Sequence, residues 1–96
     1  MRPYEVLFIV RPDLDEEQTE AVINKFTDLI EKEGGEIVKV DKWGKRKFAY
    51  EIDKKWKDGF YTLVNFNSEP AVASELERVM KISDEIIRQM ITRIGE

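Results

Sequence analysis

The sequence predicts an α+β domain in which helices cover one face of an antiparallel sheet. Two kinds of apolar pattern alternate along the 96 residues. Short runs with a period of two predict strands, and apolar residues three and four apart predict helices. Their order is strand, helix, strand, strand, helix, strand. The length is that of one domain, residues 1–96, with no room for a second core.

The first strand and the first helix have clear boundaries in the sequence. Residues 4–10 form an apolar run between two prolines, which predicts a buried strand with apolar side chains on both faces. Asp15 followed by Gln18 predicts a helix start close to a capping box. An apolar stripe then continues until Gly34 and Gly35, which mark the end of the helix.

Two further strands are expected in the middle of the chain. Alternation begins over residues 36–40 and resumes over 48–52, while Gly44 interrupts it and predicts a bulge or a close backbone approach. A turn is expected over residues 53–59, because this polar stretch ends in Asp-Gly. The return strand is expected over residues 60–66, so that a long antiparallel hairpin forms.

The second half of the chain completes the fold. Pro70 predicts the first turn of another helix, and the last strand is expected over residues 86–94. This order predicts a ferredoxin-like split βαβ fold, with a four-stranded antiparallel sheet and two helices on one face. Right-handed crossovers place the first and third strands in the centre of the sheet. The residues expected on the face without helices are Leu7, Ile9, Tyr61, Leu63, Arg88 and Met90.

Composition and motifs argue against catalysis. The chain contains no Cys and no His, so it lacks thiolate chemistry and the commonest metal ligand. Capping and the helix dipole explain the paired acids at the first helix start, and no glycine-rich phosphate loop follows a strand. We therefore expect no enzyme, cofactor, metal site or small-molecule substrate. Because no apolar run approaches ~18 residues and no signal peptide is present, we expect a cytoplasmic protein without a membrane partner.

Charge is distributed unevenly along the chain. Eight Lys or Arg and three acids lie between Lys39 and Lys57, whereas nine acids and two lysines lie between Asp13 and Glu36. A local basic patch can bind nucleic acid even on a chain with a net charge of −4. The lysines would also discourage edge-to-edge strand pairing, so both interpretations remain open. Trp43 in this segment fits either a cap over the core or an anchor for protein or RNA.

An RNA-recognition motif is an alternative with the same topology. Residues 59–66 loosely resemble the aromatic third strand of that motif. The spacing differs, because one extra residue separates the Gly-aromatic start from the Val-x-Phe end. Tyr61 is also the only aromatic residue that we expect on the open face, whereas the motif needs a stacking pair. The motif is therefore kept only as an alternative.

Five segments together resemble the family of ribosomal protein six of the bacterial small subunit. They are the start Met1-Arg2-x-Tyr4-Glu5-Val6, the turn Pro12–Asp15, the strand entry Gly34–Ile37, the block Trp43–Ile52 and the segment Ile82–Arg88. The resemblance extends over essentially all 96 residues, and the tryptophan-containing block is specific to the family. The fold that it implies is the ferredoxin-like one.

The resemblance implies a structural, non-catalytic constituent of the small ribosomal subunit. It implies binding to the central domain of small-subunit ribosomal RNA as a heterodimer with small-subunit ribosomal protein eighteen. By position, the candidates for contacts with the RNA backbone are Arg2, Arg46, Arg88 and Lys54. The candidates for the partner side of the sheet are Leu7, Ile9, Tyr61, Leu63 and Met90. The alternative is a generic ferredoxin-like module for protein interaction or ligand binding, which a homodimer indifferent to RNA would favour.

Overall fold

The structure is a computed structural model that describes residues 1–48 and 56–95. Within these residues the order of elements is the one that the sequence predicts. The elements are β1 (Arg2–Val10), α1 (Glu16–Lys32), β2 (Glu36–Lys47), β3 (Asp58–Ser68), α2 (Pro70–Ile82) and β4 (Ile86–Arg93).

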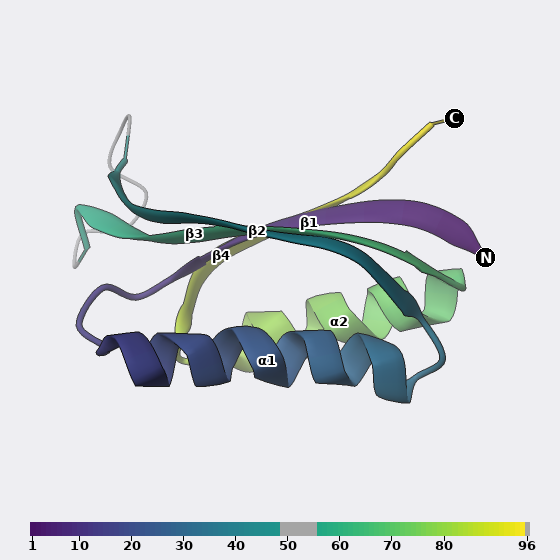
Figure 1. Ribbon diagram of the computed structural model, residues 1–96, viewed down its shortest axis with the longest axis horizontal. Coiled ribbons are helices and arrows are strands. Elements are labelled where there is room, and N and C mark those ends of the chain that lie inside the picture. The colour runs from purple at the N-terminus through teal and green to yellow at the C-terminus, as the bar shows by residue number, and fades with distance from the viewer. Residues whose placement is uncertain (49–55, 96) are drawn as a thin grey trace.

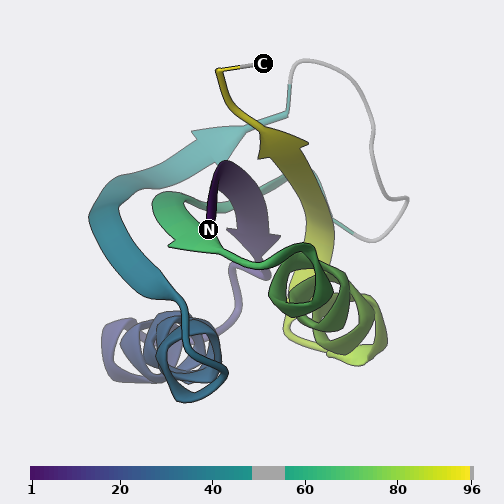
Figure 2. The same ribbon diagram turned by 90° about the vertical axis from the view of Figure 1, so that its right-hand side faces the viewer.

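The strands described form one antiparallel sheet with the order β2-β3-β1-β4. The first and third strands are therefore central, as right-handed crossovers predict. In Figure 1 α1 and α2 lie on the same side of the sheet, and the end-on view in Figure 2 shows them side by side beneath it. The predicted ferredoxin-like fold is confirmed.

Local sequence explains where α1 begins and ends. The Asp15 carboxylate accepts a hydrogen bond of 2.7 Å from the backbone N–H of Gln18, whose side-chain oxygen accepts one of 3.1 Å from the Asp15 N–H. This reciprocal pair is a capping box, which satisfies donors that the first helical turn leaves unpaired. At the other end Gly34 has a φ of 94°, a left-handed conformation that ends the helix at low cost.

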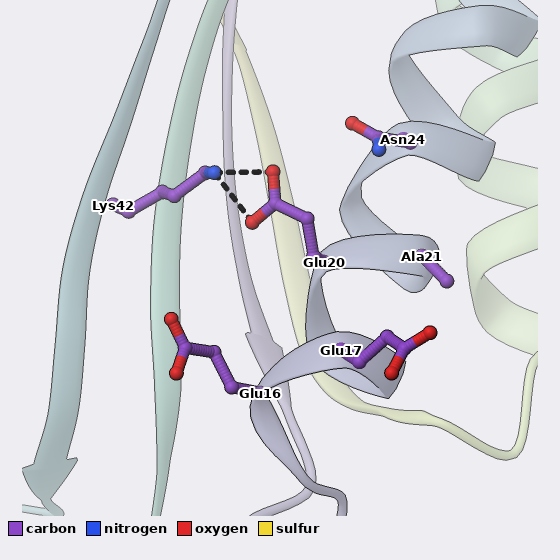
Figure 3. A pocket seen from close by; sticks show the side chains of 6 residues that line it. All are labelled: Glu16, Glu17, Glu20, Ala21, Asn24 and Lys42. Atoms are coloured by element: carbon purple, nitrogen blue, oxygen red, sulfur yellow. Dashed lines mark hydrogen bonds and ion pairs between the residues drawn. The ribbon is translucent and has the colours of Figure 1, made fainter.

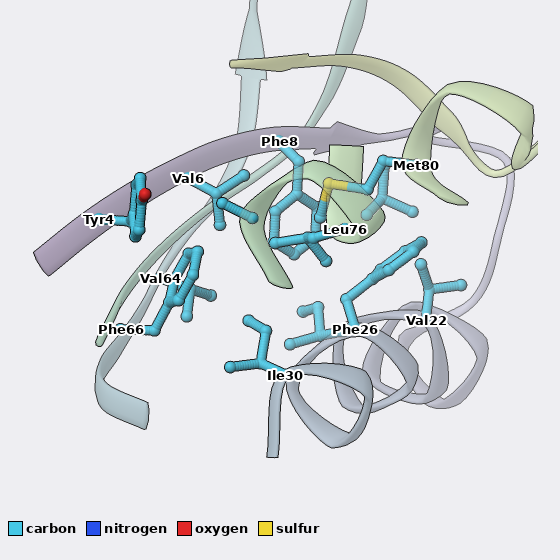
Figure 4. Close-up of a cluster of buried hydrophobic side chains, with 13 residues drawn as sticks. Tyr4, Val6, Phe8, Val22, Phe26, Ile30, Val64, Phe66, Leu76 and Met80 are labelled. Carbon is cyan, nitrogen blue, oxygen red and sulfur yellow. The ribbon is translucent and has the colours of Figure 1, made fainter. Parts of the chain in front are cut away.

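The core fills the space between the sheet and the helices. Alternate side chains of β1 point into it and meet apolar residues of α1 and α2 (Figure 4). Phe8 is fully buried at its centre, and its ring packs edge-to-face on Phe26 at a centroid distance of 5.8 Å. Tyr4 stacks on Phe66 at 5.5 Å nearer the start of the strand. These contacts hold both helices against one face of the sheet.

The long hairpin contains one predicted bulge and one that the sequence did not predict. The register of β2 against β3 shifts between Lys42 and Gly44, where Gly44 adopts a φ of 84°. The expected interruption at Gly44 is thus confirmed as a β-bulge. A second shift lies between Ile37 and Lys39. No glycine or proline lies at this point of the sequence, so the sequence does not predict it.

The predicted boundary between the turn and the return strand is wrong. β3 already includes Asp58 and Gly59, which pair with Lys47 and Arg46. Gly59 is buried in the sheet, and a Cβ added there would lie 2.4 Å from the Ile9 Cγ2. Asp-Gly therefore reflects a close approach between strands and does not mark a turn.

The second half of the β2 prediction is only partly covered by the structure. The sequence predicts strand from residue 48 to residue 52. In the structure β2 ends at Lys47, so Phe48 is not a strand residue. The Phe48 N–H still donates a hydrogen bond of 3.0 Å to the carbonyl of Lys57, which continues the pairing of the hairpin. The rest of that expected strand, and most of the expected turn, fall within residues 49–55 and lie outside the described residues.

Candidate functional site

The candidate site is the face of the sheet opposite α1 and α2. Residues that alternate with the core side chains of β1 and β3 point to this face, and the pairing registers align them in rows across the strands. The two central rows are Tyr61, Ile9 and Arg88, and Leu63, Leu7 and Met90. The side chains expected on the open face therefore lie together in adjacent rows.

The residues proposed for the partner side of the sheet differ in how much surface they present. Met90 is 58% exposed, and Leu7, Tyr61 and Leu63 are half-buried. Ile9 is only 4% exposed although it points to the same face. Its methyl group occupies the space where a side chain at position 59 would lie, which explains its burial. Ile9 is thus buried below the surface of the open face. The accessible surface is formed by the other four residues, Leu7, Tyr61, Leu63 and Met90.

An aromatic corner stands at one end of this face. It consists of Trp43, Phe48, Tyr61 and Arg46. The rings of Trp43 and Tyr61 stack at a centroid distance of 6.1 Å with 9° between their planes, and Phe48 approaches Tyr61 at 6.4 Å. The Arg46 guanidinium lies 5.3 Å from the centroid of the Trp43 ring, within the range of a cation–π interaction.

Sequence reasoning missed this corner, because it expected Tyr61 to be the only aromatic residue on the open face. The bulge before Gly44 inserts an extra residue into β2 opposite Tyr61. That extra residue is Trp43, whose ring therefore reaches the open face. The signal that predicts the bulge, a glycine within an alternating strand, was enough to place Trp43 beside the return strand.

The arginines proposed for RNA contacts are not all brought together. Arg46 and Arg88 occupy the same half of the open face, on the two edge strands, roughly 16 Å apart at the usual strand spacing and rise. Arg2 pairs with Ser68 at the far end of the sheet, about 23 Å along the strand from the row of Arg88, and alternation places it on the side of the core residues and not on the open face. Lys54 lies outside the described residues. The described arginines can therefore contact separate phosphates but cannot share one.

The basic segment is divided between the two faces of the sheet. The pairing places Arg46 opposite Gly59 on the open face. Lys42 instead points toward α1, where its ammonium group binds both carboxylate oxygens of Glu20 (Figure 3). Lys42 is therefore removed from the basic surface that the sequence suggested, and its charge is offset by an acid of the helix.

The hollow between α1 and β2 does not have the features of a catalytic site. It is lined by Glu16, Glu17, Glu20, Ala21, Asn24 and Lys42 (Figure 3). Its acids belong to an exposed helix surface, and no nucleophile paired with a base lies among these lining residues. Over residues 1–48 and 56–95, no group of three or more His, Cys, Asp or Glu is placed to hold a metal ion. None of the described helices is long and apolar enough to span a bilayer.

Sequence comparison places this two-faced sheet in a known family. The family model of ribosomal protein S6 matches residues 3–93, nearly the whole chain. The chain belongs to the ribosomal protein S6 family. Its members are structural proteins of the small ribosomal subunit and not enzymes, so the place of action is the cytoplasmic ribosome.

Individual relatives match along nearly their full length. Small ribosomal subunit protein bS6 of Heliobacterium modesticaldum is 59% identical over 96 residues, which cover 100% of this chain and 99% of the relative. The bS6 protein of Moorella thermoacetica is 56% identical over 96 residues, covering 100% of this chain and 97% of its own. The predicted family is thus confirmed.

Solved structures agree with the fold. The crystal structure of 30S ribosomal protein S6 from Thermotoga maritima has a TM-score of 0.89 and 40% identity, and the alignment covers 96% of this chain and 86% of that one. The C-terminal domain of the MgtC protein from Mycobacterium tuberculosis also matches, with a TM-score of 0.62. At 14% identity this second likeness concerns the fold alone.

Proposed function

We propose that this S6-family chain binds the central domain of small-subunit ribosomal RNA as a heterodimer with small-subunit ribosomal protein eighteen. Membership of the S6 family over residues 3–93 is the observation that carries the proposal. The distribution of charge and apolar surface on the open face supports it, because that surface offers separate places for a protein and for phosphate groups.

Charge favours an RNA that approaches from the open face or its ends. Arg46 and Arg88 are exposed there, and guanidinium groups bind phosphate oxygens through paired hydrogen bonds while remaining charged. The outer surface of α1 begins with the exposed acids Glu16 and Glu17. These acids would repel phosphate at the start of α1, so we assign the RNA contacts to Arg46 and Arg88. Further candidates are Lys54 and Arg2, which is exposed at the opposite end of the sheet.

The apolar middle of the same face suits a protein partner. Leu7, Leu63 and Met90 lie in one row and present apolar surface without a cation among them. Protein interfaces typically have such an apolar centre with a charged rim. A partner seated on this row, with Tyr61 beside it, would leave the arginines at the edges of the face accessible to RNA.

A salt-dependent titration tests this function directly. A junction fragment of the central-domain ribosomal RNA is titrated with the chain alone, with protein eighteen alone and with both proteins. We expect tight binding only with both proteins, and the logarithm of the affinity should fall linearly with the logarithm of salt concentration because bound phosphates release counterions.

Two arginine variants sharpen the titration. In Arg88→Ala the heterodimer should bind the RNA about tenfold more weakly and with a salt slope reduced by about one, since one phosphate contact is lost. Arg78→Ala is the matched control, because Arg78 lies on α2 and pairs there with Glu75. Equal affinities for the two variants would remove Arg88 from the RNA-binding set.

The generic interaction module remains the competing function. It predicts that the folded chain forms a stable homodimer or binds a small ligand, with no response to the RNA in the presence of protein eighteen. Sedimentation of the chain alone, run beside the titration, separates the two functions.

A further inference from the structure

The aromatic corner has the construction of a preorganised anchor. The Trp43 indole N–H donates a hydrogen bond of 3.2 Å to the Asp41 carboxylate, while Tyr61 stacks on the ring and Arg46 lies over it. Three neighbours thus hold the ring, yet 37% of Trp43 remains exposed. A side chain that is already ordered loses little conformational entropy when a partner covers it.

The corner is also continuous with the apolar middle of the face. Tyr61 lies two residues from Leu63 along β3, and its partner across the sheet is Ile9. The strand β3 therefore leads from the aromatic corner directly into the Leu63 row. Tryptophan, tyrosine and arginine are the residues most enriched among those that dominate binding energy in protein interfaces.

The charges around the ring favour a protein over RNA at this point. Asp41 places a carboxylate at the edge of the Trp43 ring, and this negative charge opposes a phosphate group there. Arg46 already lies over the ring, which restricts the access of a base to that ring. A partner protein can place an apolar side chain against Trp43 and a hydrogen-bond donor beside the Asp41 carboxylate, which leaves Arg46 for RNA.

We propose that Trp43, supported by Tyr61, is the anchor that binds the partner protein on the open face. This inference rests on the proposed function and names a residue beyond the five assigned to the partner surface. Trp43 and Tyr61 form the end of the contact nearest Arg46. The protein contact therefore ends beside the arginine that we assign to RNA.

Calorimetric titration with protein eighteen, without RNA, is the first test. We expect Trp43→Ala to weaken partner binding at least about tenfold, because loss of an interface anchor typically costs more than about 1.4 kcal/mol. Trp43→Phe should lose less, since it keeps a ring against Tyr61. Ile82→Ala is the matched control, because Ile82 is an exposed apolar residue, 69% exposed, at the end of α2 and away from the open face.

Fluorescence gives a second readout that does not depend on a destabilising variant. In Trp56→Phe the indole at position 43 is the remaining tryptophan of the chain. Addition of protein eighteen, or of a tryptophan-free variant of it, should shift the emission to shorter wavelength and protect the indole from iodide quenching. Addition of RNA alone should do neither.

The outcomes separate this inference from the function on which it rests. If the wild-type chain binds neither partner nor RNA, the proposed function fails. If wild type binds the partner and folded Trp43→Ala binds it equally well, only the anchor is overturned. A Trp43→Ala variant that binds the partner normally but weakens RNA binding by the heterodimer would place the ring against RNA, which also overturns the proposal.

Discussion

The two faces of the sheet are formed by the same strands but differ in how much of their apolar surface is exposed to solvent. On the helix-covered face Phe8 and its neighbours are withdrawn from water, whereas Met90 on the open face is 58% exposed. Strand composition does not explain the difference, because apolar residues alternate onto both faces of β1 and β3. The difference arises because α1 and α2 each carry one apolar stripe and both are packed against the same face.

This contrast shows how the domain divides its apolar surface between stability and binding. Burial on the covered face contributes to folding of the isolated chain, at about 25 cal/mol for each Å² of apolar surface removed from water. Apolar groups left in water on the open face contribute little until a partner covers them. Substitutions on the covered face should therefore lower the free energy of unfolding, whereas substitutions on the open face should weaken partner binding.

The largest effect is expected from Phe8→Ala on the covered face. Phe8 is fully buried in the core between the sheet and the helices, so its removal should leave a cavity and lower the free energy of unfolding by about 3–5 kcal/mol. Urea denaturation followed by circular dichroism measures this loss. A loss below about 1 kcal/mol would mean that the covered face is not the main source of stability.

A smaller loss is expected from Gly59→Ala within the sheet. The added Cβ would lie 2.4 Å from the Ile9 Cγ2 and 3.0 Å from the Val10 carbonyl oxygen, so the strands must shift, at a cost of about 1–3 kcal/mol. Gly44→Ala is the informative comparison. Among the described residues, no atom beyond its chain neighbours lies within 4 Å of where a Cβ would stand at Gly44. Its cost of about 1 kcal/mol should therefore come only from the left-handed backbone. Gly59→Ala should lower the free energy of unfolding by more than Gly44→Ala does, and a smaller loss at Gly59 than at Gly44 would argue against steric contact there.

Removal of the cap of α1 should have a moderate effect on the layer that covers the sheet. Asp15→Ala deletes the acceptor for the Gln18 N–H and should lower the free energy of unfolding by about 1 kcal/mol. Partner binding at the open face should be unchanged once the variant is folded. Asp28→Ala, an exposed position later in the same helix, serves as the control for loss of one carboxylate. A cap variant as stable as this control would contradict the structural role of the capping box.

The smallest expected effect concerns an ion pair on the outer surface of α2. A hydrogen bond from Arg78, together with its positive charge, lowers the pKa of Glu75 below its ordinary value. Because the pKa in the folded state is depressed, the pair stabilises the fold above the ordinary carboxylate pKa, and this contribution disappears as the pH falls through the lowered value. An NMR titration of the Glu75 side chain measures the shift. In Arg78→Gln the pKa should return toward its ordinary value, and an unchanged pKa would exclude the pair as the cause.

Much of the fold could be predicted from the sequence because its signals are local. Asp15 with Gln18 predicts a helix start, Gly34 its end, and the alternation along β1 predicts the core face. The start of β3 could not be predicted, since Asp-Gly usually indicates a turn. Only the distance between Gly59 and Ile9 shows that the glycine is needed for close packing.

The candidate site could be predicted only in part, because only some of its residues are placed by local sequence signals. Period-two alternation is enough to place Leu7, Leu63 and Met90 on one face. Pairing between distant segments decides the rest. The bulge at Gly44 brings Trp43 onto Tyr61, and the register of β2 sends Lys42 to Glu20 instead of to the basic surface. Neither result follows from the composition of the basic segment alone.

The most direct test of this division between the faces is a map of backbone amide shifts as protein eighteen is added to the isotope-labelled chain. We predict that shifts concentrate in the open-face rows of β1, β3 and β4 and in the aromatic corner, while the amides of α1 and α2 stay near their free positions. Shifts concentrated along α1 and α2, with the sheet unaffected, would contradict the account.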